Sequence, residues 1–177
     1  MSLLYDLLGM GLLGIIAFQD FKYKAVSWIV FPILFLLSVL SVLQESAFEY
    51  VAGQLMLNLI FIAFQLFILT VYFTIKNRKF INIGKNYLGL GDILFFVVLA
   101  ASFSFLNFVF IYILSLFGIA IIYMLYRIIK KNAAEKIPLA GGMAIVMISC
   151  LLFKNSTVNF NFYDDTYALA FLSGLII

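Results

Sequence analysis

The stretch VAGQLMLNLIFIAFQLFILTVYFTI, at positions Val51–Ile75, contains no charged side chain. A helix needs about 20 mostly apolar residues to cross the hydrocarbon core of a bilayer, so this stretch is long enough to span one. Further apolar runs lie on both sides of it, separated by short polar connections, at Leu3–Gln19, Val26–Leu43, Leu88–Phe105, Phe108–Ile128 and Ile137–Phe153. The pattern predicts an all-α fold, a polytopic integral membrane helix bundle of about six transmembrane helices.

The composition of the whole chain agrees with a membrane domain. Hydrophobic residues make up 66% of the 177 residues and charged residues 11%, and the mean hydropathy is +1.19. A soluble domain is usually about half apolar and about a quarter charged. No polar segment is long enough to form a separate soluble domain, so residues 1–177 are predicted to form a single transmembrane domain.

The end of the chain is predicted to differ from the rest. Residues 154–177 would hold an outer loop, polar through Asn155–Asn161, and then a short hydrophobic segment. Thr166–Ile177 is too short for a full span. Its placement stays open between a re-entrant segment, an interfacial segment and the start of a seventh helix.

The positive charges predict an orientation in the membrane. All but one of the 11 lysines and arginines fall in the first, third and fifth connections, whereas Lys154 alone lies on the other side, together with Glu45, Glu49, Asp164 and Asp165. Basic residues collect on the cytoplasmic side of membrane proteins. The N-terminus is therefore predicted to lie outside, with the odd-numbered connections in the cytoplasm. The first run is expected to stay as a helix and not to be cleaved as a signal peptide, because it lacks a basic N-terminal region.

Several chemistries are excluded by residues that the sequence lacks. There is no histidine, so a Ser-His-Asp or Cys-His nucleophile system cannot form. The single cysteine, Cys150, lies in an apolar run and rules out an internal disulfide or a multi-cysteine zinc site. We expect no cofactor and no metal.

Two aspartates are the candidate catalytic residues. Asp20 lies at the inner end of the first run and Asp92 near the inner start of the fourth, so both are predicted at the same membrane depth. A carboxylate beside the hydrocarbon is costly and indicates a functional site. If the two helices pack together, the pair would share a proton. The ionised member would activate a water and the protonated member would polarise a carbonyl, as in aspartic proteases.

Each aspartate also has a purely structural interpretation. Asp20 precedes Lys22 and Lys24 and would be an interfacial residue paired with a lysine. Asp92 would be a helix N-cap preceded by glycines. The context of Asp92 favours function, because Gly89 and Gly91 let the backbone bend and let another chain approach closely at a membrane boundary.

The motifs around these residues resemble a known family. Gly89-Leu90-Gly91-Asp92 resembles the GxGD signature of membrane aspartic proteases. The stretch from Asp20 to Val26 resembles the first motif of the type IV prepilin peptidases, and Lys136–Gly142 resembles their late Ile-Pro-Phe-Gly-Pro motif. The resemblance covers most of the chain, from about Leu7 to Leu152, and does not extend to the motifs of the presenilin group.

The chain departs from the family pattern at several positions. Ser27 stands where the family often has proline, and Leu94 stands where many bacterial members carry lysine. The late motif is copied only loosely at Leu139–Gly141. The cytoplasmic cysteine-bearing domain of the bifunctional members is missing, so the resemblance implies a short form without methyltransferase activity.

The resemblance implies an activity, a site and partners. It implies an aspartic endopeptidase, with Asp20 and Asp92 catalytic and Gly89 and Gly91 as backbone support. The substrates would be pilin-like precursors with a basic leader and a hydrophobic helix, cut at the cytoplasmic face of a prokaryotic inner membrane. Membrane lipids would be further partners, and nucleic acid would not.

Three other features carry alternatives. Lys24 is a candidate substrate contact, and so is Pro138, which would otherwise simply start the last helix. The connection Lys76–Leu88 is long and would act as a substrate-binding lid. The polar residues Gln54, Asn58 and Gln65 share one helix face and are expected to make interhelical hydrogen bonds in preference to a permeation path.

Two other functions remain open at this point. A small ion- or proton-coupled transporter would use Asp20 and Asp92 as a relay, although carrier sites tend to lie near the bilayer midplane. A non-catalytic membrane scaffold would keep the fold without the chemistry.

Overall fold

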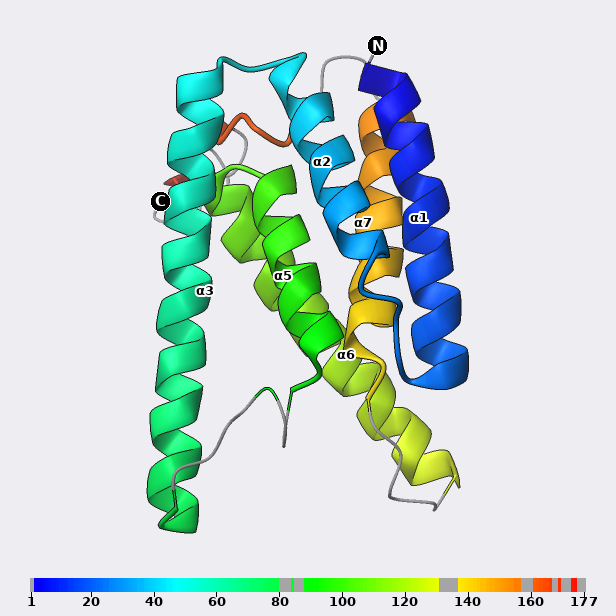
Figure 1. The fold of residues 1–177 in the computed structure, drawn as a ribbon, viewed down its shortest axis with the longest axis vertical. Helices are drawn as coiled ribbons and strands as arrows, with labels where there is room; N and C mark the ends of the chain where they lie inside the picture. Colours follow the sequence, from blue (N-terminus) through cyan, green and yellow to red (C-terminus); the bar gives the residue numbers. More distant parts are fainter. Residues whose placement is uncertain are drawn as a thin grey trace.

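The protein is an all-α bundle in the computed structural model, which describes residues 2–79, 84, 88–130, 137–156, 161–166, 169 and 173–174. The helices in these ranges are α1 (Ser2–Tyr23), α2 (Val30–Leu43), α3 (Phe48–Asn77), α5 (Leu90–Ser102), α6 (Phe105–Lys130) and α7 (Leu139–Ser156). Successive helices run in alternating directions (Figure 1). The predicted all-α helix bundle is confirmed.

The helices differ in their ability to cross a membrane. Four of them, α1, α3, α6 and α7, are long and apolar enough to span one. The other two are shorter, with 14 residues in α2 and 13 in α5. At 1.5 Å per residue these two are only about 20 Å long, against about 30 Å of hydrocarbon. The chain is therefore a membrane protein, but the predicted spans Val26–Leu43 and Leu88–Phe105 were drawn too long.

The late start of α2 has a local cause. α1 ends at Tyr23, and Lys24 adopts a left-handed backbone conformation with φ 53°, so its amide donates back to the Asp20 carbonyl at 3.0 Å. The Ser27 amide then donates to the Gln19 side chain at 2.9 Å. These bonds hold the chain against the end of α1, and the next helical turn begins only at Val30.

The core lies between α1, α2, α5 and α7. α1 packs most extensively against α7 and α2, and α2 packs against α5. The fully buried side chains that fill the interface are Leu13, Ile16, Phe31, Leu34, Phe95, Leu99, Met143 and Met147. α3 lies at the edge, and the lower ends of α3 and α6 extend beyond those of α1 and α5 (Figure 1). The core helices therefore converge at their inner ends inside a wider frame.

Polar side chains attach α3 to this core. Asn58 is fully buried and donates to the carbonyls of Ala100 and Phe103 at 2.8 and 2.9 Å. Gln54 accepts a hydrogen bond from the Phe105 amide at 2.8 Å. These three hydrogen bonds satisfy backbone groups at the α5–α6 corner that water cannot reach in a membrane. The expected interhelical role is confirmed for these two residues.

The outer loop is a packed cap over that corner. Tyr163 is buried and donates from its hydroxyl to the Ala101 carbonyl at 3.2 Å. Asn107 donates to the Phe162 carbonyl at 3.0 Å. The loop residues 161–165 are therefore part of the folded domain. Most of the short hydrophobic segment Thr166–Ile177 lies outside the described residues.

Candidate active site

Asp20 lies in the last turn of α1, against the first turn of α7. Its side chain is buried, with 7% of the residue exposed, and its Oδ2 accepts a hydrogen bond from the Gly141 amide at 2.6 Å. A Cβ atom on Gly141 would lie 3.1 Å from Oδ2 and 3.1 Å from Cβ of Asp20. The close approach therefore depends on glycine at this position.

Asp92 lies in the first turn of α5 and uses both carboxylate oxygens. Oδ2 accepts from the Gly89 amide and Oδ1 accepts from the Ala140 amide, each at 3.0 Å. Gly89 is the N-cap of α5 and Asp92 stands at N3, so the predicted N-cap role of Asp92 is wrong; its carboxylate instead reaches back to the N-cap amide. The second bond reaches a different helix, which local capping does not require.

The two glycines before Asp92 act through their size. Gly89 has φ −67° and ψ 147°, which any residue adopts, and no described glycine has a positive φ. A Cβ on Gly89 would lie 3.1 Å from Asp92 Oδ2, and one on Gly91 would lie 3.6 Å from the Phe31 ring. The expected backbone bend is therefore not what the glycines supply; Gly89 leaves room for the carboxylate, whereas a Cβ on Gly91 would make only ordinary contact with Phe31.

The first turn of α7 brings the two aspartates to one place. α1 packs mainly against α7 and α2, whereas α5 packs mainly against α2 and α3 and makes a smaller contact with α7. The direct contact between α1 and α5 that the sequence interpretation considered is therefore replaced by contacts of both aspartates with α7. Asp92 and Asp20 accept from the consecutive amides of Ala140 and Gly141. The first amides of a helix have no partner within it and carry the positive end of its dipole. Two carboxylates therefore share one small electropositive turn.

Both aspartates also line one cavity of about 520 Å³. Its other lining residues are Lys24, Ala25, Val26, Gly84, Leu88, Gly89, Leu90, Gly91, Ile137, Leu139 and Ala140. Asp20 forms no ion pair with Lys22 or Lys24 among the described side chains, where both ion pairs involve Lys154. Lys24 thus lies in the cavity as predicted for a substrate contact, but the lysine-paired interpretation of Asp20 is not what the structure has.

Other predicted site residues fall around this cavity. Pro138 immediately precedes α7 and its carbonyl accepts the Gly142 amide at 3.1 Å, so it starts the helix, and its side chain lines a neighbouring groove. Gly84 and Leu88 of the predicted lid line the cavity, while the lid's residues 80–83 and 85–87 lie outside the described residues. No three His, Cys, Asp or Glu side chains group as metal ligands in the part of the chain that is described.

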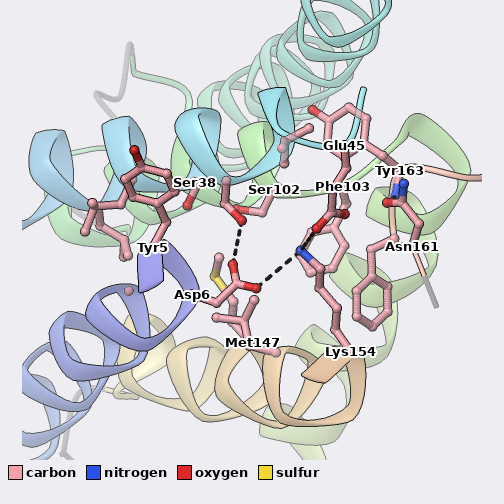
Figure 2. Close-up of a pocket in the computed structure, with 17 residues that line it drawn as sticks. Tyr5, Asp6, Ser38, Glu45, Ser102, Phe103, Met147, Lys154, Asn161 and Tyr163 are labelled. Atoms are coloured by element: carbon pink, nitrogen blue, oxygen red, sulfur yellow. Dashed lines mark hydrogen bonds and ion pairs between the residues drawn. The ribbon is translucent and has the colours of Figure 1, made fainter. Parts of the chain in front are cut away.

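A second buried charge cluster was missed by the sequence interpretation. At the outer end of α1, the Lys154 ammonium lies 3.3 Å from Asp6 Oδ2 and 2.9 Å from Glu45 Oε1. Ser41 donates to Asp6 Oδ1 at 2.6 Å. Figure 2 shows these groups converging beside a cavity of about 40 Å³. The available signal was a lone acid near the start of the first predicted span and a lone base directly after the last one.

The two described backbone amides that hold the aspartates were missed as well. Gly142 packs closely against α6, because a Cβ there would lie 2.7 Å from the Ile119 side chain. Gly141 also donates to Asp20. A proline followed by a helical run was the signal that a free helix N-terminus lies here.

No protein-family model, curated protein or solved structure matches this chain.

Proposed function

We propose that this protein is a membrane aspartic endopeptidase that works through Asp20 and Asp92. The observation that carries the proposal is the convergence of two carboxylates, from α1 and α5, on consecutive amides of α7 at the wall of one cavity. An aspartate with a purely structural role needs only one hydrogen-bond or ion-pair partner. Two of them at one site, with no cation in ion-pair contact among the described residues, favour chemistry over packing.

The arrangement suits acid–base hydrolysis of a peptide bond. Two like charges close together in a site of low dielectric share a proton, so one group is a base while the other is an acid. The base would take a proton from a water as it attacks the scissile carbonyl. The acid would donate its proton to the carbonyl oxygen, which gives a gem-diol. As the C–N bond breaks, the former base would pass the water proton to the leaving amine, and a gem-diol hydroxyl would return a proton to the other carboxylate. The amides of Ala140 and Gly141 would keep both carboxylates in fixed positions during this exchange.

The substrate class in this proposal comes from the resemblance of the motifs at Asp20, Gly89–Asp92 and Lys136–Gly142 to the type IV prepilin peptidases. It is a pilin-like precursor with a basic leader, a glycine junction and a hydrophobic helix. The precursor would enter from the membrane and be cut at the cytoplasmic boundary of a prokaryotic inner membrane. The excess of basic residues in the odd-numbered connections supports that orientation.

The carrier alternative is less well supported by the packing. A relay across the membrane would need a polar path from the inner aspartates to the outer charge cluster. Between them α1 presents Leu13 and Ile16, each 0% exposed, and α7 presents Met143, Ala144 and Met147. Among the described residues this layer is apolar and closely packed, so it separates the two charged sites.

The experiment that tests the proposal is cleavage of a purified precursor in detergent or nanodiscs. Wild type is compared with Asp20→Asn and Asp92→Asn, and we expect each substitution to abolish cleavage. Asp6→Asn is the matched control, because Asp6 is also a buried aspartate of α1 but lies at the other end of the helix. It should cleave at a rate close to wild type per folded molecule.

Two outcomes of this experiment would contradict the proposal. If Asp20→Asn and Asp92→Asn both cleave as fast as wild type, the two-aspartate mechanism is wrong. If no form cleaves any of several precursors while all are folded, the peptidase proposal loses to the carrier or scaffold interpretations. A flux assay in liposomes then separates those two, because only a carrier gives ion-dependent flux.

A further inference from the structure

A large apolar groove lies beside the aspartate cavity, between α6 and α7 at the end of α1. Its volume is about 940 Å³, near the upper end of the range for small-molecule sites. The lining residues are Phe21, Lys22, Lys24, Leu114, Ser115, Gly118, Ile119, Ile122, Tyr123, Tyr126, Ile137, Pro138, Gly142, Ile145 and Val146. Ile122 and Leu114 are 68% and 58% exposed, so the groove lies open along the lipid-facing surface.

The groove is polar at one end and apolar along its length. Lys22 lies in the last turn of α1 and Lys24 follows that helix, while Pro138 directly precedes α7, so these residues mark the inner end. From there the lining continues toward Leu114 through isoleucines and Gly118. A Cβ on Gly118 would meet nothing within 4 Å, so this part of the groove is open. One charged end and one long apolar channel match the shape of a lipid.

The positive charges of Lys22 and Lys24 are not compensated by an ion pair among the described residues. Neither forms an ion pair with a described carboxylate, whereas Lys154 at the outer end binds two. The Lys22 ammonium lies 5.1 Å from the ring centroids of Phe18 and Tyr23, which hold it at the surface without neutralising it. Both lysines are exposed and line the same groove. Among the described residues this end of the groove therefore holds two ammonium groups without an ion-pair partner, and an anionic group would complement them.

We propose that the groove between α6 and α7 binds one anionic phospholipid, with its phosphate at Lys22 and Lys24 and an acyl chain along Gly118. Basic pockets between transmembrane helices bind anionic headgroups in this way. The charge favours a lipid over the hydrophobic helix of a precursor, because such a helix offers these ammonium groups no anionic partner. Lys24 and Ile137 line both the groove and the aspartate cavity, so the bound lipid would form one wall of the site.

The first test measures lipid selectivity. Protein in detergent is equilibrated with equal amounts of phosphatidylglycerol and phosphatidylcholine, and bound lipid is counted by native mass spectrometry. Wild type should retain phosphatidylglycerol preferentially, and Lys22→Gln/Lys24→Gln should lose about 30-fold of that preference. Lys76→Gln is the matched control, because Lys76 also lies over an aromatic ring, 5.8 Å from that of Tyr72, but does not line the groove. Equal selectivity in both variants would overturn the proposal.

The second test fills the channel without touching the lysines. Gly118→Leu places a side chain in the open part of the groove and should reduce retention of both lipids by about tenfold. Gly14→Leu is its control, because a Cβ on Gly14 also meets nothing within 4 Å and Gly14 is exposed on α1 outside the groove. If Gly118→Leu leaves lipid retention unchanged and instead raises the KM for a precursor, the occupant is a peptide helix and the lipid proposal is wrong. Retention is measured without cleavage, so unchanged retention alone overturns the lipid proposal whether or not the protein is a peptidase; only the KM readout depends on the peptidase proposal.

Discussion

The two ends of α1 carry buried aspartates in opposite electrostatic situations. At the outer end, Asp6 faces Lys154 at 3.3 Å and accepts from Ser41, so its charge is compensated by a cation and a hydroxyl. At the inner end, Asp20 accepts from the Gly141 amide and lines a cavity together with a second carboxylate, Asp92. The aspartate at the outer end of α1 is therefore neutralised by a cation and stabilises the fold. The aspartate at the inner end lacks an ion-pair partner among the described residues.

The difference shows how to separate structural from functional charges in a membrane bundle. A buried ion needs a partner of opposite charge or it destabilises the fold. The outer cluster meets that requirement through Lys154. The inner pair meets it only partly, with the amides of a helix N-terminus, and keeps two acids beside an open cavity. Holding two acids close together costs stability, and the proposed peptidase mechanism requires such an arrangement.

The largest effect should come from neutralising the inner pair. Asp20→Asn or Asp92→Asn should each lower kcat/KM for a precursor by about 10⁴-fold, because the pair loses its general base or acid. The same substitutions should leave the thermal midpoint unchanged or raise it, since the cost of holding a second acid in a buried site is removed. Precursor cleavage and thermal unfolding in one detergent measure both quantities.

This combination distinguishes a catalytic pair from a structural one. A large fall in the midpoint along with the loss of cleavage would show that Asp20 holds α1 to α7 and that the inactivity is secondary. A double variant gives a further check, because two residues of one catalytic unit should lose no more together than separately.

The next largest effect should appear at the outer cluster, on stability. Lys154→Met leaves Asp6 buried, with 3% of its side chain exposed and without its cation. Removing one partner of a buried ion pair costs about 3–5 kcal/mol. We expect that loss in equilibrium unfolding in mixed micelles, with cleavage per folded molecule retained. The double variant Asp6→Asn/Lys154→Met should recover part of the stability, and a double variant worse than either single one would contradict the pairing.

The helix bundle was largely predictable from sequence because the bilayer fixes the length and polarity of its elements. Uncharged runs such as Val51–Ile75 leave few alternatives to a helix. The ends of α2 and α5 were not predictable, because they depend on contacts between distant residues. The Ser27 amide is held by Gln19, and the end of α5 is covered by the loop around Tyr163.

The two aspartates of the site could be identified from the sequence. The backbone contacts that bring them together could not. A carboxylate at a membrane boundary and a Gly-x-Gly-Asp turn identify Asp20 and Asp92 as candidates from sequence alone. Their meeting point is made by the amides of Ala140 and Gly141, and an amide carries no sequence signature. The pair between Asp6 and Lys154 joins the first and last described helices, so only the packing of α1 on α7 reveals it.

A smaller effect should follow from crowding the inner site. In Gly141→Ala the new Cβ would lie 3.1 Å from Asp20 Oδ2, so the carboxylate or α7 must move by a few tenths of an ångström. Misplacing a catalytic group by such amounts should lower kcat/KM about 10- to 100-fold. Gly9→Ala is the matched control at the outer end of α1, where a Cβ would lie 3.7 Å from Leu34 Cδ1 in ordinary contact. Equal cleavage by the two variants would show that the Gly141 contact does not position Asp20.

The smallest effect should come from the hydroxyl that completes the outer cluster. Ser41 is 5% exposed and donates to Asp6 Oδ1 at 2.6 Å. Ser41→Ala should cost about 1.5 kcal/mol in unfolding, because a hydrogen bond to a charged group is lost. Ser38→Ala, one turn earlier on α2 and lining the same cavity, is the control and should cost less. In an Asp6→Asn background the cost of Ser41→Ala should fall, because the acceptor is no longer charged. An unchanged cost there would mean that Ser41 stabilises α2 by packing, and that Lys154 alone compensates the charge of Asp6.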